Sequence, residues 1–493
     1  MRLKQILSLL PFSEQFSELN DIEINTIKMD SREITKDDLF VCINGFTVDG
    51  HDFVEEAVEN GASVIVAERQ VDTKVKVPVV IVPNTVRFLA IAAGVYYQFP
   101  THQIPLIGVT GTNGKTTVTY LLETIFNHAA EKTGVIGTIQ MKIGQDTYPI
   151  ENTTPNALFL QKTIRKMVDE GVQKVIMEVS SHALDLGRVY GCNYDIAIFT
   201  NLTQDHLDYH ESMEDYLRAK SLLFAQLGNS YHTDSRKFAI INQDDPASPK
   251  FERSTAQPVV TYGITSKADI MAKDIRLTPS GTRFLLCTPY GNTVINSKLI
   301  GKFNVSNMLA ACTAALVAGI SLPIIKKAYE SIQGVNGRFE PVTHDQLFSV
   351  IVDYAHTPDS LENVLATIQE FATHNIYVVV GCGGDRDRTK RPLMAQIAVQ
   401  YADFAIFTSD NPRTEDPQII LNDMTVGLPH TATNYQVVID RRKAIHQAIK
   451  LANQGDIVLI AGKGHETYQQ IGHTKYHFDD REVAIEALQA KET

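Results

Sequence analysis

A glycine-rich segment at residues 109–120, VTGTNGKTTVTY, carries groups suited to holding the phosphates of a nucleotide. Gly111 and Gly114 allow a tight turn, and Lys115 adds a mobile cation beside it. The hydroxyl of Thr116, next in the chain, can ligate a nucleotide-bound Mg²⁺. Val109 stands where the usual phosphate loop has its first glycine, so this loop is a shorter variant, GTNGKT. An ordinary glycine turn is the alternative, but this combination at one junction favours nucleotide binding.

Acidic and imidazole groups follow two apolar segments of the same region and could hold a metal ion. Glu178 closes the segment KVIMEV. The next apolar segment leads into NLTQDHLDYH, which supplies Asp205, His206, Asp208 and His210. Mg²⁺ prefers oxygen ligands, which Glu178 and Thr116 would provide. His206 is a less usual ligand for so hard an ion, so a metal ligand and a hydrogen-bonded loop histidine are equally good interpretations here.

Lys220 lies on the apolar face of a helix that the spacing predicts over residues 213–227. The apolar residues on that face are Met213, Tyr216, Leu217, Leu223, Phe224 and Leu227. A lysine that faces inward is unfavourable unless it is paired, neutral or modified. Spacing alone favours the milder alternative, in which the stem lies along the core and the amine reaches out to an acid.

Three polar loops in the last third of the chain, GGDRDRTKR, SDNPRTED and GKGHE, each follow an apolar segment. They would bring together, at one sheet edge, Arg386, Arg388, Arg391, Asp410, Arg413 and Glu466. This mixture suits a zwitterionic ligand, because guanidinium groups grip a carboxylate while acids hold an ammonium. Solvated loops are the alternative, but their shared placement after strands favours a site.

The elements that must position these groups follow from the apolar pattern, which predicts an α/β fold with parallel sheets covered on both faces. IPLIGV and TYLLETIF frame the phosphate loop as strand and helix, whereas HDFVEEAVENGA predicts a helix in a small N-terminal α/β unit. Residues 268–301 contain strand-like segments separated by the turns PSG and PYGN, which predicts antiparallel strands at one edge of the central domain. Breaks near residues 100 and 335 predict three domains, residues 1–100, 101–335 and 336–493.

Composition limits the class of protein. The 493 residues carry a net charge of -12, which argues against nonspecific nucleic-acid binding and fits small-molecule partners. Five cysteines without a C-x-x-C pair are typical of a reducing cytoplasm. No apolar run approaches the roughly 18 residues of a membrane span, and the N-terminal residues lack a signal-peptide cleavage site.

Motifs along nearly the whole chain resemble the Mur ligases. They are GVTGTNGKTT, MEVSSHALDLGR, NLTQDHLDYH, YLRAKSLLF, GKFNVSNMLAA, GRFE, VDYAHTPDS and GKGHE. Within that family MDSR, NTTP and DNPR resemble the members that add meso-diaminopimelate to UDP-N-acetylmuramoyl-L-alanyl-D-glutamate in cytoplasmic peptidoglycan precursor synthesis. The resemblance implies a small N-terminal domain for the UDP substrate, a central phosphate-loop ATPase domain and a C-terminal Rossmann-like domain for the amino acid.

The resemblance also implies a mechanism. ATP would phosphorylate the D-glutamate carboxylate, and the amine of diaminopimelate would attack the acyl phosphate. ATP would be held by Gly111, Thr112, Asn113, Gly114, Lys115, Thr116, Thr117, Asn304, Arg338 and Asp353. Mg²⁺ would be held by Thr116, Glu178, His206 and Lys220, with Lys220 modified by CO₂ to a carbamate. Lys115, Lys220, His206 and Glu178 are thus the expected catalytic group, so the resemblance reverses the milder interpretations of His206 and Lys220.

The substrate contacts implied by the resemblance fall into two sets. The UDP-linked substrate would meet Ser31, Asn152, Thr153, Thr154, Ser180 and Arg188. The amino acid would meet Arg386, Asp410, Asn411, Pro412, Arg413, Gly462 and Glu466. Some relatives carry glutamine where this chain has Leu186, so one substrate contact is in doubt.

Three alternatives stay open at this point. A lysine-adding ligase and a folylpolyglutamate synthase share the same central logic, although DNPR and the N-terminal unit argue against them. An ATP-dependent switch protein would not need Lys220 or the zwitterion-binding loops. We expect a monomer without nucleic-acid or membrane partners.

Overall fold

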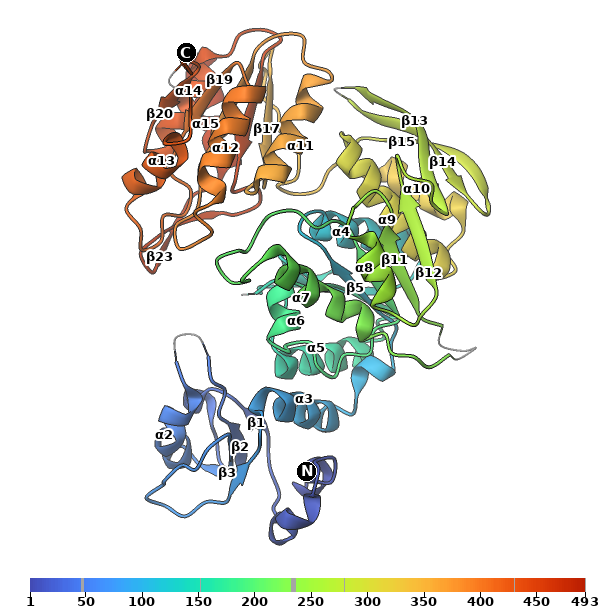
Figure 1. Cartoon of the computed structure of the whole chain (residues 1–493), viewed down its shortest axis with the longest axis vertical. Helices are drawn as coiled ribbons and strands as arrows, with labels where there is room; N and C mark the ends of the chain where they lie inside the picture. The colour runs from blue at the N-terminus through green and yellow to red at the C-terminus, as the bar shows by residue number, and fades with distance from the viewer. Residues whose placement is uncertain (46–47, 151, 232–235, 279, 430, 493) are drawn as a thin grey trace. The chain divides into compact units, whose positions relative to one another are not determined.

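The computed structural model describes residues 1–45, 48–150, 152–231, 236–278, 280–429 and 431–492 (Figure 1). The chain forms two compact units. Unit 1 contains residues 1–108, 131–196 and 230–237, and unit 2 contains residues 109–130, 197–229 and 238–493. Within the described residues, no helix combines the length and apolar character needed to cross a membrane.

Unit 1 contains a small parallel sheet of order β1-β2-β3-β4, drawn in blue in Figure 1. Its strands are Ile27–Lys28, Asp38–Val41, Ala62–Ala67 and Val79–Ile81. Its helices are α1 (Lys4–Leu7), α2 (Val54–Glu59) and α3 (Thr85–Tyr96). Alternate residues of β2 enter two different hydrophobic clusters, Leu39 one and Phe40 the other, so both faces of this sheet are buried.

One boundary of this small unit was predicted wrongly. The helix predicted over residues 51–62 is a 3-10 turn (Gly50–Phe53) followed by α2, and it ends at Glu59. Gly61 then takes a positive φ of 113° and turns the chain into β3. The strand therefore begins at Ala62, the last residue of the predicted helix, because the turn precedes it.

The rest of unit 1 contributes the strand order β9-β6-β7-β8 of the larger central sheet. These strands are β6 (Thr133–Ile136), β7 (Met141–Ile143), β8 (Asp146–Tyr148) and β9 (Lys174–Glu178). The helices here are α5 (Ala157–Asp169) and α6 (Ser181–Asp185), and both begin at a residue, Asn156 or Ser180, whose side chain caps the helix.

Unit 2 contributes the order β15-β14-β13-β12-β11-β10, and β5 (Leu106–Thr110) is divided between the units. The strands are β10 (Ile196–Phe199), β11 (Phe238–Asn242), β12 (Val259–Gly263), β13 (Ile270–Thr278), β14 (Gly281–Thr288) and β15 (Gly291–Ser297). The helices are α4 (Lys115–His128), α7 (Met213–Ala225), α8 (Ser248–Arg253), α9 (Lys302–Val317) and α10 (Leu322–Ser331). Strands β13 to β15 pair antiparallel, which confirms the prediction for residues 268–301.

The last third of the chain, also in unit 2, forms a sheet of order β16-β17-β21-β18-β19-β20, in which all pairs except β16–β17 are parallel. The strands are β16 (Glu340–Val342), β17 (Ser349–Asp353), β18 (Ile376–Val380), β19 (Phe404–Phe407), β20 (Tyr435–Val437) and β21 (Ile457–Ala461). A hairpin of β22 (Tyr468–Ile471) and β23 (Thr474–His477) follows. This confirms the predicted α/β class, with loops leaving the carboxyl ends of parallel strands together.

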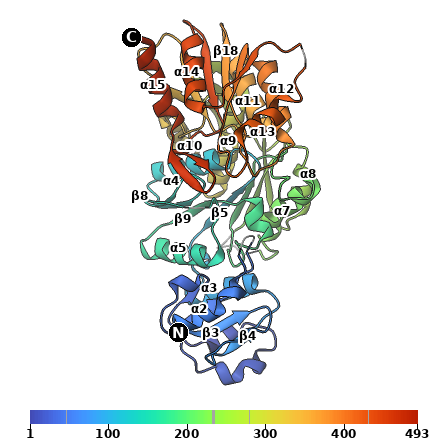
Figure 2. The same ribbon diagram turned by 90° about the vertical axis from the view of Figure 1, so that its left-hand side faces the viewer.

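Helices cover both faces of this sheet, as Figure 2 shows on the two sides of β18. One hydrophobic cluster includes residues of α11 (Pro358–Gln369), α12 (Lys390–Tyr401) and α13 (Pro417–Thr425). The opposite cluster includes residues of α14 (Arg441–Leu451) and α15 (Asp480–Glu492). Two buried faces hold the strand ends rigidly, which is the condition for placing side chains from three different loops in one site.

Candidate nucleotide and amino-acid site

The phosphate loop needs glycine at both of its turning points. Gly111 and Gly114 have φ values of 148° and 87°. A Cβ at Gly111 would collide with the hydroxyl of Thr200, and one at Gly114 with the side-chain oxygen of Asn307. The loop therefore fits closely between the end of β10 and helix α9, and any larger residue would move it.

Hydrogen bonds fix this loop to the segment that follows β10. The backbone carbonyl of Asn201 accepts from the Thr112 N–H at 2.9 Å, and its Oδ1 accepts from the Asn113 N–H at 2.8 Å. The Thr200 hydroxyl donates to the Asn113 carbonyl at 2.6 Å. The loop is thus preorganised at the N-terminus of α4, where backbone N–H groups and the helix dipole favour an anion.

Two lysine amines converge on one carbonyl of the loop. Lys115 Nζ donates to the carbonyls of Gly111 and Thr112, each at 2.8 Å, and Lys220 Nζ donates to the same Gly111 carbonyl at 2.9 Å. Lys220 is only 1% exposed, so the interpretation in which its amine reaches out to an acid is wrong. Burial, with a contribution from the charge of Lys115, lowers its pKa well below the ordinary value, although Asp205 opposes this.

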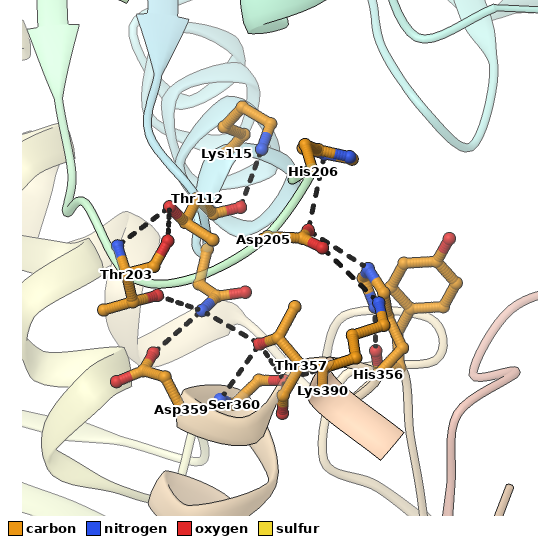
Figure 3. A network of polar contacts seen from close by, with 12 residues as sticks. Thr112, Lys115, Thr203, Asp205, His206, His356, Thr357, Asp359, Ser360 and Lys390 are labelled. Carbon is orange, nitrogen blue, oxygen red and sulfur yellow. Dashed lines mark hydrogen bonds and ion pairs between the residues drawn. The ribbon is translucent and has the colours of Figure 1, made fainter. Parts of the chain in front are cut away.

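Asp205 lies at the centre of a second polar group. Its carboxylate lies 3.3 Å from Nε2 of His206, and Figure 3 shows His356 and Lys390 on its other side. Lys390 Nζ lies 3.4 Å from Oδ1, and both side chains are almost fully buried. Burial opposes ionisation of Asp205, but the charges of Lys390 and His206 outweigh it and hold the pKa of Asp205 well below its usual range.

His356 contributes to this group as a neutral side chain. Burial, helped by the charge of Lys390, lowers the pKa of His356 to about 4. Its Nδ1 lies 2.8 Å from the carbonyl of Tyr354, and its Nε2 lies 3.9 Å from Asp205. Lys390 is therefore the cation that pairs with Asp205 at neutral pH.

The further residues expected to contact ATP border the same loop. Arg338 Nη2 donates to the Thr116 hydroxyl at 3.2 Å. Asp353 accepts from the backbone N–H of Phe339 at 2.6 Å, and burial raises the pKa of Asp353 to about 6 although Arg338 opposes it. Asn304, in the first turn of α9, donates to the carbonyl of Ile300 at 2.8 Å. Thr117 is buried in the first turn of α4.

Nearby, the loop makes a direct contact with helix α11. The Asn113 amide donates to the Asp359 carboxylate at 2.8 Å. Thr357 caps α11 through a capping box with Ser360, which fixes the position of Asp359 in the first turn (Figure 3). The last third of the chain therefore meets the phosphate loop and the start of α4 through Asp359 and Arg338, and it meets Asp205, after β10, through Lys390.

The expected metal ligands are divided between the two units. Thr116, His206 and Lys220 belong to unit 2, and Glu178 belongs to unit 1. Glu178 is buried and accepts from the N–H and the hydroxyl of Thr138, each at 2.9 Å. Among the described residues, no group of three or more His, Cys, Asp and Glu side chains is arranged to hold a metal ion. The expected set also includes a hydroxyl and a modified amine, and such oxygen donors fit Mg²⁺.

Three of the six residues expected to contact the UDP-linked substrate line two cavities of unit 1. Ser31 and Asn152 line a cavity of about 1330 Å³, and Asn152, Arg188 and Leu186 line another of about 410 Å³. Ser31 donates to Glu56 at 2.6 Å. The apolar Leu186, the position at which the resemblance left one substrate contact in doubt, thus lies in the wall of the second cavity.

Thr153, Thr154 and Ser180 form a hydrogen-bonded group beside Glu178. The Thr153 hydroxyl lies 3.1 Å from that of Thr138, and the Thr154 hydroxyl donates to the Glu178 carbonyl at 2.9 Å. The Ser180 N–H donates to Thr154 Oγ1 at 3.0 Å, and Arg188 donates to the Thr154 carbonyl at 3.3 Å. Four of the expected contacts are therefore close together.

The expected amino-acid contacts come from the loops after β18, β19 and β21. A Cβ at Gly383 would lie 2.9 Å from Nη1 of Arg413 and 3.7 Å from Cγ of Arg386, so both arginines lie against this glycine. Arg413 donates to the Gly384 carbonyl at 2.7 Å, and burial lowers its pKa with help from Arg386. A Cβ at Gly384 would also collide with the carbonyl of Pro412, which shows how closely the first two loops approach.

The acidic half of this site joins the second and third loops. The Asn411 amide donates to Glu466 at 2.8 Å, and a Cβ at Gly462 would lie 2.6 Å from Oδ2 of Asp410. Asp410 and Glu466 are both near-buried, with side chains 10% and 15% exposed. The three loops therefore meet, and place two arginines and two acids around one position.

Two arginines of the predicted charge cluster have another role. Arg391 is fully buried and makes a bidentate pair with Glu415, at 3.0 and 2.8 Å, and a further bond to Asp423 at 2.7 Å. Arg388 also bonds to Glu415, at 2.9 Å. The charge pattern alone could not separate these arginines from Arg386 and Arg413, because Glu415 lies in the same run of charged residues, whereas the resemblance implied only Arg386 and Arg413 as amino-acid contacts.

Sequence reasoning also missed two buried lysines, Lys390 and Lys463. Both lie inside quoted motifs, GGDRDRTKR and GKGHE, so the available signal was a lysine among glycines and acids after a strand. Lys463 Nζ donates to Asn411 and to Glu466, each at 3.0 Å.

The fold and this site define a class of protein: a nucleotide-binding α/β protein with parallel-sheet cores, in which one unit holds both a phosphate loop and a cluster of two arginines and two acids on three loops. Family models agree on the particular family. The Mur ligase family catalytic domain matches residues 23–97, the Mur ligase middle domain residues 109–315, and the Mur ligase glutamate ligase domain residues 337–464. The chain belongs to the Mur ligase family.

Individual relatives cover the full length of the chain. It is 62% identical over 491 residues to the UDP-N-acetylmuramoyl-L-alanyl-D-glutamate–2,6-diaminopimelate ligase of Oceanobacillus iheyensis, with 100% of both chains covered. It is 56% identical to the ligase of the same name from Geobacillus thermodenitrificans, again with 100% of both covered. A solved structure of a ligase with that name superposes with a TM-score of 0.70 at 32% identity, covering 100% of this chain and 99% of the other.

Proposed function

We propose that this chain is an ATP-dependent ligase that adds meso-diaminopimelate to the D-glutamate carboxylate of UDP-N-acetylmuramoyl-L-alanyl-D-glutamate in peptidoglycan precursor synthesis. The observation that carries the proposal is the joint placement, in one unit, of the phosphate loop and the two-arginine, two-acid site. Full-length relatives that bear this ligase name support the choice of substrates. A nucleotide switch protein would need no amino-acid site.

The reaction begins at the phosphate loop. The γ-phosphoryl group of ATP passes to a carboxylate oxygen of D-glutamate, ADP leaves, and an acyl phosphate forms. Gly111 to Thr117 hold the triphosphate. Lys115 leaves its two carbonyl partners and pairs with the negative charge that develops on the transferred phosphoryl group. Asn304, Arg338 and Asp353 complete the ATP contacts.

Mg²⁺ would be held by Thr116, Glu178, His206 and modified Lys220, and when bound it supplies positive charge to the phosphoryl oxygens. Lys220 is suited to modification because its amine is buried and beside another cation. Its nitrogen forms a bond to the carbon of CO₂ and loses a proton, which gives a carbamate. The change replaces a buried amine with an oxygen ligand.

The second half of the reaction occurs at the three loops after β18, β19 and β21. Arg386 and Arg413 bind carboxylate of diaminopimelate, while Asp410 and Glu466 bind an ammonium, with Asn411, Pro412 and Gly462 shaping the site. The free amine attacks the acyl carbon, phosphate leaves, and the amide nitrogen releases its proton.

The remaining proposals concern substrate, organisation and location. The UDP-linked dipeptide meets Ser31, Asn152, Thr153, Thr154, Ser180 and Arg188. The three domains divide at about residues 100 and 335. The enzyme acts in the cytoplasm as a monomer.

The test is phosphate release from ATP with the UDP-linked dipeptide and one added amino acid. We expect meso-diaminopimelate to stimulate release strongly and L-lysine weakly, with a new amide product for the former. Preference for lysine would identify the lysine-adding alternative. Release without any amide product would favour the switch protein.

A further inference from the structure

A fully buried lysine, Lys463, lies at the centre of the proposed amino-acid site. It stands between Gly462 and Gly464, whose φ values are 116° and 51°. A Cβ at either glycine would lie 2.6 Å from a polar oxygen, on Asp410 for the first and on Gly337 for the second. The two glycines therefore let the chain approach both neighbours and turn the lysine inward.

The ammonium of Lys463 binds residues from two of the loops. It donates to Oδ1 of Asn411 and to Oε2 of Glu466, each at 3.0 Å, and lies 3.9 Å from Oδ1 of Asp410. The Asn411 amide donates to the same Glu466 oxygen at 2.8 Å. The N–H of Gln470, on the β22–β23 hairpin, donates to the same Asn411 oxygen at 2.9 Å. One cation therefore orients two proposed substrate contacts.

Lys463 also sets the net charge of the acidic half of the site, which contains Asp410 and Glu466. Two buried carboxylates near one another do not both ionise readily unless a cation lies between them. Burial raises the pKa of Glu466, and Lys463 opposes this shift. With Lys463 in place, Asp410 and Glu466 can both be ionised, and the three groups together carry one negative charge. That charge matches one ammonium of a zwitterion.

We propose that Lys463 is a positioning residue for the amino-acid substrate. It holds Glu466 and Asn411 in place and leaves the acidic half of the site with the single negative charge that one substrate ammonium needs. Because Lys463 is fully buried, it acts through Glu466 and Asn411 and does not itself touch the amino acid. This inference rests on the proposed function of the site.

Lys475 provides a matched control within the same part of the chain. Both lysine ammonium groups lie over the ring of Tyr468, at 5.5 Å for Lys463 and 4.2 Å for Lys475. Lys475 lies opposite Gln470 on the exposed strand β23, and among the described residues it makes no hydrogen bond or ion pair with Asp410 or Glu466. Loss of Lys475 therefore tests what a lysine over Tyr468 contributes without the acidic site.

The first experiment compares Lys463→Met with Lys475→Met in the full-length enzyme. We expect Lys463→Met to raise KM for meso-diaminopimelate at least about tenfold, with the KM values for ATP and for the UDP-linked dipeptide within about twofold of the parent. Lys475→Met should leave all three within about twofold. An unchanged amino-acid KM in Lys463→Met, or an equal rise in both variants, would overturn the proposal.

A double-mutant cycle with Glu466→Gln covers the case in which Lys463→Met does not fold, because removing both members of this buried pair leaves the net charge of the acidic half unchanged, with the single negative charge on Asp410. We expect Lys463→Met combined with Glu466→Gln to raise KM no more than about threefold beyond Glu466→Gln alone, because only the smaller part of the effect, which acts through Asn411, remains. A further tenfold rise would mean that Lys463 acts independently of Glu466 and would contradict the proposal.

The parent enzyme separates this inference from the proposed function. If the parent does not accept meso-diaminopimelate, the proposed function fails whatever the variants do. If the parent accepts it and Lys463→Met keeps the parent KM for it, only the role of Lys463 fails.

Discussion

Two fully buried lysines of unit 2, Lys220 and Lys463, have opposite surroundings. The amine of Lys220 bonds to the Gly111 carbonyl, and Lys115 shares that carbonyl, so a second cation lies beside it. The ammonium of Lys463 instead bonds to Glu466 and lies near Asp410. Both lysines lie in motifs that the sequence analysis singled out. Of the two, only Lys463 forms ion pairs with carboxylates of the described residues.

The difference separates two uses of a buried amine. An amine beside another cation is disfavoured in its charged form, which leaves a neutral nucleophile available for modification. An ammonium between two acids is stable as a cation and can hold those acids in position. In the proposed mechanism the phosphate loop region therefore uses a lysine for its reactivity, and the amino-acid region uses one for its charge.

Substitution of Lys220 should have the largest effect. We expect Lys220→Ala to lose at least about 100-fold in kcat, because it removes the proposed carbamate and with it a proposed ligand for Mg²⁺. Short carboxylic acids such as formate should restore part of the activity by occupying the carbamate's place. The measurement is steady-state phosphate release with and without added acid.

Lys115→Ala is the control for that rescue. It should be equally inactive, because the moving phosphoryl group loses its nearest cation, but a carboxylic acid cannot replace a cation. Rescue of both variants, or of neither in a folded Lys220→Ala protein, would remove the distinction between the two regions.

Arg413→Ala should have the next largest effect, in the amino-acid region alone. Arg413 lies with Arg386 against Gly383, where it would pair with the second carboxylate of diaminopimelate and repel the terminal ammonium of lysine. We expect KM for meso-diaminopimelate to rise at least about tenfold while ATP and UDP-substrate binding stay near normal. Lysine should remain a poor substrate, since removing repulsion does not create a pocket for it. Unimpaired use of diaminopimelate by the variant would contradict this substrate assignment.

Lys390→Met tests a third buried lysine, which pairs with one carboxylate, that of Asp205, whereas Lys463 lies near two. Its loss leaves Asp205 buried without its lysine, and breaking such a pair typically costs about 3 to 5 kcal/mol. We expect a lower urea midpoint and a modest fall in kcat, because Asp205 also contacts His206. Combining Lys390→Met with Asp205→Asn should recover most of the stability. Equal midpoints for Lys390→Met and the parent would show that this pair contributes nothing.

Glu415→Gln should have the smallest effect on activity, because its side chain bonds to Arg388, Arg391 and the backbone N–H of Asp385, and none of these is an expected substrate contact. Hydrogen bonding by Arg391 lowers the pKa of Glu415 to about 2, below its unfolded value near 4.3. The stability from this group is therefore present above about pH 4.3 and lost as the pH falls toward 2. We expect the variant to melt at lower temperature at pH 7, with the difference shrinking below about pH 4, and all KM values unchanged. A changed amino-acid KM would place Glu415 in the site.

The local pattern predicted much of the fold. The strand and helix that frame the phosphate loop, the antiparallel strands of residues 268–301 and the strands β17, β18, β19 and β21 all form as predicted. The elements that the pattern did not mark include α3, the strands β3, β11 and β20, and the β22–β23 hairpin. The hairpin buries few residues, because β23 is exposed throughout. Its sequence therefore lacks the alternation of apolar and polar residues that predicts a half-buried strand.

The sequence by itself determined the chemistry available to this protein: the glycines of the phosphate loop, the lysine on an apolar helix face, and charged loops after strands. Glycine spacing and apolar periodicity are local properties, so they can be recognised in the chain and matched to the Mur ligase motifs. Only the tertiary structure decided which charges compensate one another. Arg391 pairs with Glu415, Lys390 with Asp205, and Lys463 with Glu466, whereas Lys220 meets Lys115. Those partners depend on distances that are set by the packing of elements far apart in the sequence. The identity of a charged residue does not show which other charge will lie beside it.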